Sequence, residues 1–405
     1  MIINFSVKNF RSIKDEITIE FNASSDKDHI NFVTETKYCN ILNANAIYGL
    51  NASGKSNIIR AIQIVDMLVY LSFKDDKSLE RLITPFLFDA GSRKLPSEFN
   101  INFVHNEIRY EYGFAADKKQ VYSEWMYAYP NKKAQLLFTR EWLNDAYEYK
   151  FGANYKGERE SIKKLVPQSA LFLSVARSLG QKSITVVSDW FAKLSIELVS
   201  RHAEMGKQRA IDYIEESTIT KEEMIAFLIR ADISISDFDI KEENVVVPED
   251  FPEALKEFIS DKNKEVITQH LISGQSYSLS FSDESSGTQQ VFNFAAQVIR
   301  TIKNGGVLVI DELNSFLHPL LVKHIVGLFG NLETNPQRAQ LIFTTHETSI
   351  MTTDFLRRDQ IWFCDKSKEQ STMLYSAQEF SPRKTDNLEK AYLAGRYGAI
   401  PIFTN

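Results

Sequence analysis

The chain has 405 residues, a formal net charge of −6 at pH 7 and a hydrophobic fraction of 43%. These values are those of an ordinary globular protein, and they exclude a fibrous or largely disordered chain and a surface that is basic throughout. A chain of this length holds two or three domain-sized units, or one large domain with an insertion.

The first 150 residues contain strand patterns on either side of one helix pattern. Two alternating runs, IINFSVKNF and EITIEF, predict a strand hairpin at the start of the chain. The run Asn45–Tyr48 predicts another strand, and from Lys55 apolar residues recur at three- and four-residue spacing, which indicates a helix. Residues 98–151 alternate with period two and predict an antiparallel β-meander. A platform for stacking nucleic-acid bases is the alternative for its aromatic residues, but the regular alternation favours a half-buried sheet.

The middle of the chain, residues 168–231, has a mainly helical pattern, in which Thr220 and Glu223 predict a capping box. A charged segment containing Pro248 and Pro252 follows, and it is the best candidate for an insertion or linker. From residue 276 onward, apolar strand patterns alternate with helix patterns, which implies βαβ units and a mainly parallel sheet. We therefore predict an α/β fold in three parts: residues 1–175, a helical insertion lobe at 176–270, and residues 271–405.

The cysteine content and the first residues of the chain give information about the cellular compartment of the protein. Cys39 and Cys364 lack the spacing of metal ligands, which fits a reducing compartment. The first residues have no signal-peptide pattern, and no apolar run approaches the length of about 18 residues that spans a membrane. We expect a cytoplasmic protein with no membrane partner.

The segment GLNASGKS, from Gly49 to Ser56, is predicted to be a phosphate loop, because it lies between a strand-like and a helix-like run. Its glycines let the backbone curl so that N–H groups and the start of the next helix hold the β- and γ-phosphates of a nucleotide. Lys55 adds a positive charge, and the Ser56 hydroxyl is offered to Mg²⁺. The alternative is a chance match in a turn rich in Gly and Ser. The residues predicted to bind the nucleotide here are Asn51, Ala52, Ser53, Gly54, Lys55, Ser56 and Asn57.

A second motif, GVLVIDE, is an apolar strand that ends in Asp311 and Glu312. The carboxyl end of such a strand emerges where ligands bind in open parallel sheets, beside the phosphate loop. Asp311 is placed to hold Mg²⁺, and Glu312 to act as general base on the attacking water. Standing alone, the motif would be explained as an acidic strand end without a catalytic role; together with the phosphate loop it predicts a nucleotide site.

Two further signals follow the same order along the chain. Ser286 and Gly287 lie at the start of a predicted helix, where backbone N–H groups form an anion site. His346 ends the strand LIFTTH, from which its ring can reach the same phosphate. Taken singly, a helix cap and a locally satisfied histidine explain these residues. Their order and spacing relative to the first two motifs favour one shared site.

Together, these motifs resemble the ABC-type ATPase head of the structural-maintenance-of-chromosomes (SMC) and RecF group. The compact ATPases of bacterial abortive-infection and antiphage loci are the most similar, through the segments ELNSFLHP, FTTHETS, RRDQIWF and GRYGAIP. The resemblance implies a P-loop ABC-type ATPase head with a mainly parallel core sheet, an antiparallel β-meander and a helical middle lobe. It also implies ATP and Mg²⁺ as cofactors and a homodimer that sandwiches two nucleotides.

The resemblance implies a role for each motif residue. Ser286 and Gly287 would contact the nucleotide of the second copy, and Asn314 stands where the family often has an acidic residue. The glutamine that such heads place on the metal is not identified, and Gln120, Gln135 and Gln168 are the candidates. The implied contacts within one copy are Lys55 with phosphate, Ser56 and Asp311 with the metal, Glu312 with water, His346 with the γ-phosphate, and Arg11 with the nucleotide.

Three functions fit this ATPase. The first is a regulatory ATPase of an antiphage system, whose nucleotide state controls a separately encoded effector protein. The second is a RecF-like repair factor that clamps DNA, and the third is an ATP-bound switch with almost no turnover. For the second, a basic track would bind DNA, although scattered basic residues on an acidic protein are more often plain surface. The candidates for this track are Arg140, Lys163, Lys164, Arg357, Arg358, Arg383 and Lys384.

Overall fold

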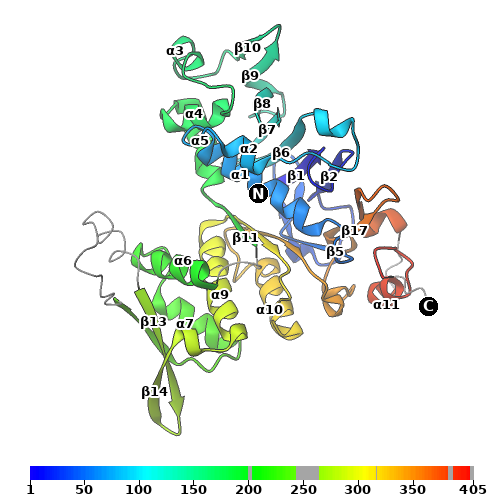
Figure 1. Ribbon diagram of the computed structural model, residues 1–405. Helices are drawn as coiled ribbons and strands as arrows, with labels where there is room; N and C mark the ends of the chain where they lie inside the picture. The colour runs from blue at the N-terminus through cyan, green and yellow to red at the C-terminus, as the bar shows by residue number, and fades with distance from the viewer. Residues whose placement is uncertain (199–202, 243–263, 316, 382–385, 402–405) are drawn as a thin grey trace.

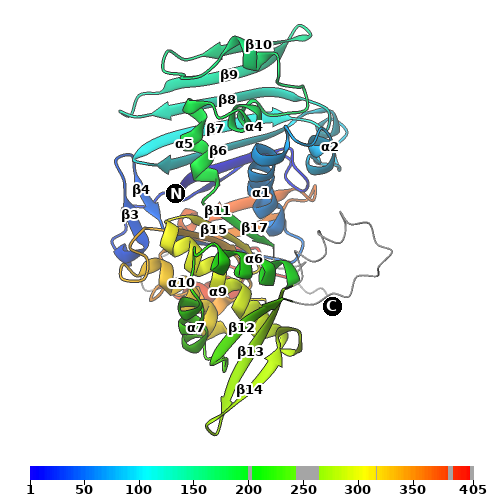
Figure 2. The same ribbon diagram turned by 90° about the vertical axis from the view of Figure 1, so that its left-hand side faces the viewer.

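The computed structural model describes residues 1–198, 203–242, 264–315, 317–381 and 386–401 (Figure 1). Its two large sheets lie one above the other with helix α1 (Lys55–Leu71) between them, as Figure 2 shows. Smaller sheets join β3 (Val33–Glu35) to β4 (Asn40–Leu42), and β12 (Asp237–Glu242) to β13 (Lys264–Ile272) and β14 (Gln275–Ser280). In the parts of the chain that are described, no helix combines the length and the apolar character needed to cross a membrane.

The first large sheet is antiparallel and has the order β10-β9-β8-β7-β6-β1-β2. It joins the predicted hairpin to the predicted meander, because β1 pairs with both β2 and β6. Both predictions are confirmed. The strands are β1 (Ile2–Lys8), β2 (Ile17–Glu20), β6 (Ser97–His105), β7 (Ile108–Ala116), β8 (Val121–Tyr129), β9 (Gln135–Leu143) and β10 (Ala146–Phe151).

The aromatic residues of the meander are part of the core. Phe103 is fully buried, and its ring stacks on that of Trp190 with 3.9 Å between ring centroids. Tyr112 and Phe114 are also fully buried. The half-buried sheet is therefore the correct interpretation for these residues, and the base-stacking platform is wrong for them.

The second large sheet has the order β11-β15-β16-β5-β17-β18, and only the β17–β18 pair is antiparallel. Every residue of β5, β15 and β16 is buried, as continuous apolar runs covered on both faces require. This confirms the predicted α/β fold with a mainly parallel core sheet. Its strands are β5 (Ala44–Gly49), β11 (Leu194–Leu198), β15 (Val307–Asp311), β16 (Gln340–Thr344), β17 (Ile361–Lys366) and β18 (Thr372–Ser376).

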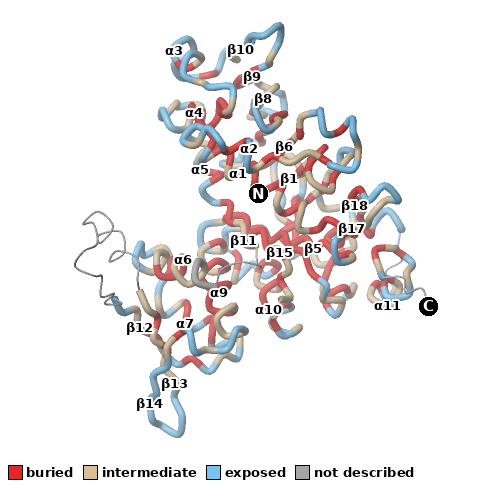
Figure 3. The backbone as a smooth tube through the Cα atoms, viewed as in Figure 1, coloured by how far each residue is buried: buried red, intermediate tan, exposed pale blue. Residues whose placement is uncertain are grey.

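Two hydrophobic cores cover the two faces of the core sheet, and Figure 3 shows that the strands of this sheet are mostly buried. One face packs on α1 and the antiparallel sheet, and it includes Ile47, Val309 and Ile342. The other packs on α7 (Lys221–Arg230), α9 (Ser286–Asn304) and α10 (Pro319–Gly330). The remaining helices are α2 (Ser78–Leu82), α3 (Glu160–Lys163), α4 (Phe172–Ser178), α5 (Lys182–Phe191), α6 (Ala203–Glu215) and α11 (Leu388–Leu393).

The middle of the chain is less helical than predicted, because residues 176–270 also contain β12 and most of β13. The capping box of Thr220 and Glu223 starts α7 as predicted, but residues 194–198 form β11 at the edge of the core sheet. The segment is therefore not helical throughout, and one of its strands belongs to the core. The segment with Pro248 and Pro252 lies outside the described residues. The division into three parts at residues 175 and 270 stays a prediction.

Candidate functional site

The phosphate loop leaves the buried strand β5 and enters α1. Gly49 has φ 148° and Gly54 has φ 113°, a region that side-chain-bearing residues rarely adopt. A Cβ atom on Gly49 would lie 2.1 Å from the Cys364 carbonyl oxygen, and one on Gly54 would lie 2.0 Å from the Thr372 Oγ1. Both positions therefore require glycine for conformation and for space.

Residues distant in the sequence hold this loop in place. The Ser12 Oγ accepts a hydrogen bond from the Asn57 Nδ2 at 2.7 Å and lies 2.7 Å from the Thr372 Oγ1. The Thr372 hydroxyl donates to the Ser53 carbonyl oxygen at 3.0 Å, and the Cys364 Sγ lies 3.5 Å from the same oxygen. The loop is thus fixed from the first hairpin and from β17 and β18. Thr372 and Cys364 belong to no motif that was recognised in the sequence.

Lys55 points back into the loop. Its side chain is 5% exposed, and its Nζ donates to the carbonyl oxygens of Gly49 at 2.7 Å and Leu50 at 2.9 Å. Burial lowers the pKa of Lys55, and the nearby Glu312 and Asp311 partly oppose this effect. A buried lysine beside two carboxylates and a curled loop is suited to neutralising an anion that enters the site.

The two carboxylates stand at the carboxyl end of β15, and Thr344 of β16 holds both residues. The Thr344 Oγ1 donates to the Asp311 Oδ1 at 2.7 Å and accepts a hydrogen bond from the Glu312 N–H at 2.7 Å. Glu312 has φ 55°, which is unusual for a residue with a side chain. The Ser315 Oγ also donates to the Glu312 Oε2 at 3.1 Å. The role of Thr344 was not predicted from the sequence, although its place at a strand end two residues before His346 was an available signal.

His346 follows β16 and is fixed by Asn314, whose Oδ1 accepts from the His346 N–H at 3.0 Å. Burial and the charge of Lys55 lower the pKa of His346, whereas Glu312 and Asp311 raise it. Strand β16 pairs in parallel with β15 on one side and with β5 on the other, so the carboxyl ends of the three strands lie side by side. The structure thus brings the phosphate loop, the strand-end carboxylates and the strand-end histidine to one edge of the core sheet.

The other residues predicted to contact the nucleotide surround Lys55. Asn51 and Ala52 are exposed at the tip of the loop, where Ala52 has φ 62°, and Ser56 is half-buried in the first turn of α1. The Ser53 Oγ is buried and has no hydrogen-bond partner. Arg11 lies in the turn after β1, where burial and the neighbouring Arg60 lower its pKa.

ATP and Mg²⁺ fit these residues. The buried Ser53 hydroxyl, which has no hydrogen-bond partner, leaves a free polar atom in the same loop as Lys55. Mg²⁺ is commonly held by one or two protein oxygens together with phosphate oxygens and water. The Ser56 hydroxyl and the Asp311 carboxylate provide that set.

Ser286 and Gly287 begin α9, whose N-cap is Ser285. The Ser285 Oγ accepts from the Thr288 N–H at 3.1 Å, while Ser286 is exposed. Beside this helix start lies a cavity of about 580 Å³ between α7, α9 and α10. Gly287 is among its lining residues, and the phosphate loop is not. The helix start is thus free to meet a second molecule.

The basic track does not form as predicted. Arg140 is fully buried and donates to the carbonyl oxygens of Ala170 and Pro167, and Arg357 is 1% exposed and paired with Asp359. Neither guanidinium can reach DNA. Arg383 and Lys384 lie outside the described residues.

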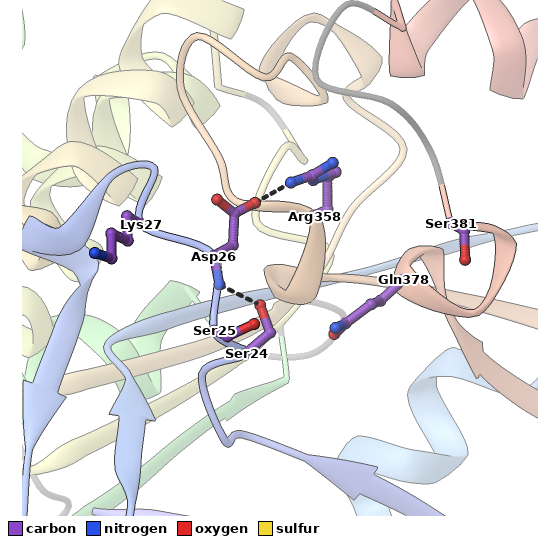
Figure 4. A pocket seen from close by; sticks show the side chains of 7 residues that line it. All are labelled: Ser24, Ser25, Asp26, Lys27, Arg358, Gln378 and Ser381. Carbon is purple, nitrogen blue, oxygen red and sulfur yellow. Dashed lines mark hydrogen bonds and ion pairs between the residues drawn. The ribbon is translucent and has the colours of Figure 1, made fainter.

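Arg358, another member of the proposed track, points into a polar cavity of about 550 Å³ and forms an ion pair with Asp26 there (Figure 4). Lys163 is paired with Glu160 in α3.

The candidate glutamines are placed in or beside the antiparallel sheet. Gln120 lies in the β7–β8 turn and bonds to Asp117, and Gln135 begins β9. The Gln168 carbonyl oxygen accepts from the N–H of Val121 at the start of β8. The glutamine that would contact the metal stays unassigned.

A parallel sheet with a glycine-rich loop entering a helix, and carboxylates at the end of a neighbouring strand, defines a P-loop ATPase. Residues 44–352 match the family described as "AAA domain, putative AbiEii toxin, Type IV TA system". The chain belongs to this family, and the resemblance to the ATPases of abortive-infection loci is confirmed.

Comparison with solved structures gave similarities over nearly the whole chain. An SMC head bound to the C-terminal winged-helix domain of ScpA has 15% identity and a TM-score of 0.48, with 97% of this chain and 99% of that chain covered. The SMC head domain from Thermotoga maritima has 14% identity and a TM-score of 0.44, with 93% and 98% covered. A head domain with an extended coiled coil, bound to the C-terminal domain of ScpA from Pyrococcus furiosus, has 14% identity and a TM-score of 0.44, with 98% of both chains covered. Comparison with curated proteins found no match.

Proposed function

We propose that this protein is a cytoplasmic, Mg²⁺-dependent ATPase whose ATP-bound form dimerises and thereby regulates a separately encoded effector in bacterial antiphage defence. The observation that supports ATP hydrolysis is that the adjacent parallel strands β5, β16 and β15 bring Lys55, Asp311, Glu312 and His346 to one edge of the core sheet. Each of the four has a different task on one triphosphate.

Lys55 would exchange its hydrogen bonds to the Gly49 and Leu50 carbonyl oxygens for bonds to the β- and γ-phosphates. Ser56 and Asp311 would hold Mg²⁺, which neutralises charge that develops on the phosphate oxygens. Glu312 would accept a proton from the attacking water, with its backbone fixed by Thr344. The lowered pKa of His346 favours the neutral ring, whose N–H can donate to the γ-phosphate.

Dimerisation is supported by the exposed start of α9. Ser286 is exposed and offers a helix N-terminus, which is suited to the γ-phosphate of ATP bound to a second copy. ATP would then lie between the phosphate loop of one copy and Ser286 and Gly287 of the other. A role in defence is supported by the family description, which names a putative AbiEii toxin of a toxin–antitoxin system.

The test measures ATP binding, ATP hydrolysis and molecular mass for three proteins. Lys55→Ala is expected to abolish ATP binding, whereas Glu312→Gln is expected to bind ATP, lose turnover and accumulate as an ATP-dependent dimer in light scattering. Glu333→Gln, an exposed carboxylate after α10, is the matched control and should behave as the wild type.

Normal ATP binding by the Lys55→Ala protein would show that the phosphate loop is not the nucleotide site. An unchanged hydrolysis rate in Glu312→Gln would remove Glu312 as the general base. A Glu312→Gln protein that stays monomeric with ATP bound would refute the sandwich dimer. Identification of a protein that copurifies with the native protein independently of salt, and whose activity follows the nucleotide state, would support the effector hypothesis.

A further inference from the structure

The loop between α2 and β6, residues 83–96, exposes three apolar side chains. Phe88 is 75% exposed, Leu87 is 51% exposed and Leu95 is 57% exposed. One exposed apolar side chain is ordinary on a protein surface, but several in one loop indicate a surface that contacts something.

This loop is held in a defined conformation by Asn9. The buried Asn9 Nδ2 donates to the carbonyl oxygens of Ser92 at 2.8 Å, Leu95 at 2.9 Å and Pro96 at 3.1 Å. Its Oδ1 accepts from the Phe86 N–H at 3.0 Å. A loop with this many internal contacts can present a side chain without a large ordering cost on binding.

The same turn of the chain connects this loop to the phosphate loop. Two residues after Asn9, the Arg11 N–H donates to the Thr84 carbonyl oxygen at 2.8 Å. Next to Arg11, the Ser12 hydroxyl accepts from the Asn57 Nδ2 in the first turn of α1. Figure 1 draws the loop between α2 and β6 near β1 and β2. The start of this loop, at Thr84, is thus joined through Arg11 and Ser12 to the first turn of α1, and Phe88 follows Thr84 by four residues.

Phe88 packs against one aromatic neighbour. Its ring meets that of the buried Phe86 edge to face, with 5.7 Å between ring centroids. The rest of its surface is open to a flat ligand. An aromatic ring with one supported edge and open remaining surface is suited to stacking against a nucleobase, which every base permits because each has a π-face.

We propose that Phe88 stacks on the adenine base of the ATP whose phosphates lie in the phosphate loop. This inference rests on the proposed function, because it assigns the base-binding part of the same nucleotide site. Lys55 then binds the phosphate end of the ligand, and the loop organised by Asn9 binds the base end. Stacking does not involve the hydrogen-bonding edge of the base. Phe88 would therefore contribute affinity for any nucleobase, without selecting adenine.

The experiment compares two ligands that share the phosphates and differ in the base. Calorimetric titration with ATP and with inorganic tripolyphosphate, both with Mg²⁺, is performed on wild type, Phe88→Ala and Phe73→Ala. Phe73 is a matched control, since it is 37% exposed and lies beyond the far end of α1, about 25 Å along a 17-residue helix from the phosphate loop.

We expect Phe88→Ala to weaken ATP binding by about fivefold to a hundredfold, the range produced by losing one base–aromatic stack. Tripolyphosphate binding should stay within about twofold, and Phe73→Ala should bind both ligands as the wild type does. The conservative variant Phe88→Tyr should keep the affinity for ATP.

Three results would overturn the inference. If Phe88→Ala bound ATP as tightly as the wild type, the base would lie elsewhere, while the proposed function would stand. If the variant lost affinity for ATP and tripolyphosphate equally, the loop would act on the phosphates instead of the base. If wild type bound neither ligand, the proposed function would be wrong as well.

Discussion

Thr344 offers the sharpest test of how the candidate site is held together. Its fully buried hydroxyl is shared by Asp311 and Glu312, at 2.7 Å in each case. Glu312 has a left-handed backbone with φ 55°, a conformation that costs about 1–3 kcal/mol and persists where neighbouring contacts enforce it. We infer that the Thr344 hydroxyl is the contact that enforces it.

Thr344→Val keeps the shape of the side chain and removes both hydrogen bonds. One buried N–H and one buried carboxylate oxygen then lose a partner, so we expect the free energy of unfolding to fall by about 1–3 kcal/mol. Because Glu312 is no longer fixed, the hydrolysis rate should also fall, by about tenfold to a hundredfold if 1.4–2.8 kcal/mol of positioning is lost.

The assay separates positioning from binding. Steady-state hydrolysis should show a lower kcat with a KM for ATP close to that of the wild type, and urea unfolding should show the loss of stability. Thr344→Ser restores the hydroxyl and should recover most of the rate. Wild-type turnover in the valine variant, or equal damage in the serine variant, would refute the positioning role.

Three further outcomes are expected. Gly54→Ala should lose ATP binding in a titration, because its Cβ would lie 2.0 Å from the Thr372 Oγ1. Burial raises the pKa of Asp66 from 3.8 to about 7, so the native state becomes less stable as the pH rises through this interval. Asp66→Asn should therefore be more stable than wild type in urea unfolding at pH 8, by up to ~4 kcal/mol, with the gap closing near pH 4. Arg357→Met leaves the buried Asp359 unpaired and should destabilise the protein by about 3–5 kcal/mol in the same assay.

Local patterns in the sequence predicted the elements that form the centre of the site. The apolar runs of β5 and β15 and the glycine spacing between β5 and α1 each identify one element without information from the rest of the chain. Strand β11 was missed because a segment of five residues between two helical patterns is too short for an alternating pattern to be recognised.

The contacts between residues far apart in the chain could not be predicted from sequence patterns. Ser12 and Thr372 are 360 residues apart, and no pattern in either segment indicates that their side chains form a hydrogen bond. The burial of Arg140 and Arg357 was missed for a related reason. A charged residue is taken as exposed unless its partners are known, and the partners of Arg140 are backbone carbonyl oxygens around the start of α4.

Strands β17 and β18 support the phosphate loop, although they are synthesised about 300 residues after it. The family match ends at residue 352, yet Cys364 and Thr372 contact the carbonyl oxygen of Ser53. A ribosome-bound chain that has reached residue 352 already contains Lys55, Asp311 and His346, but it lacks the two strands that fix the loop. The phosphate loop would then gain its full support, and with it the ability to bind nucleotide, only after residue 372 has been synthesised.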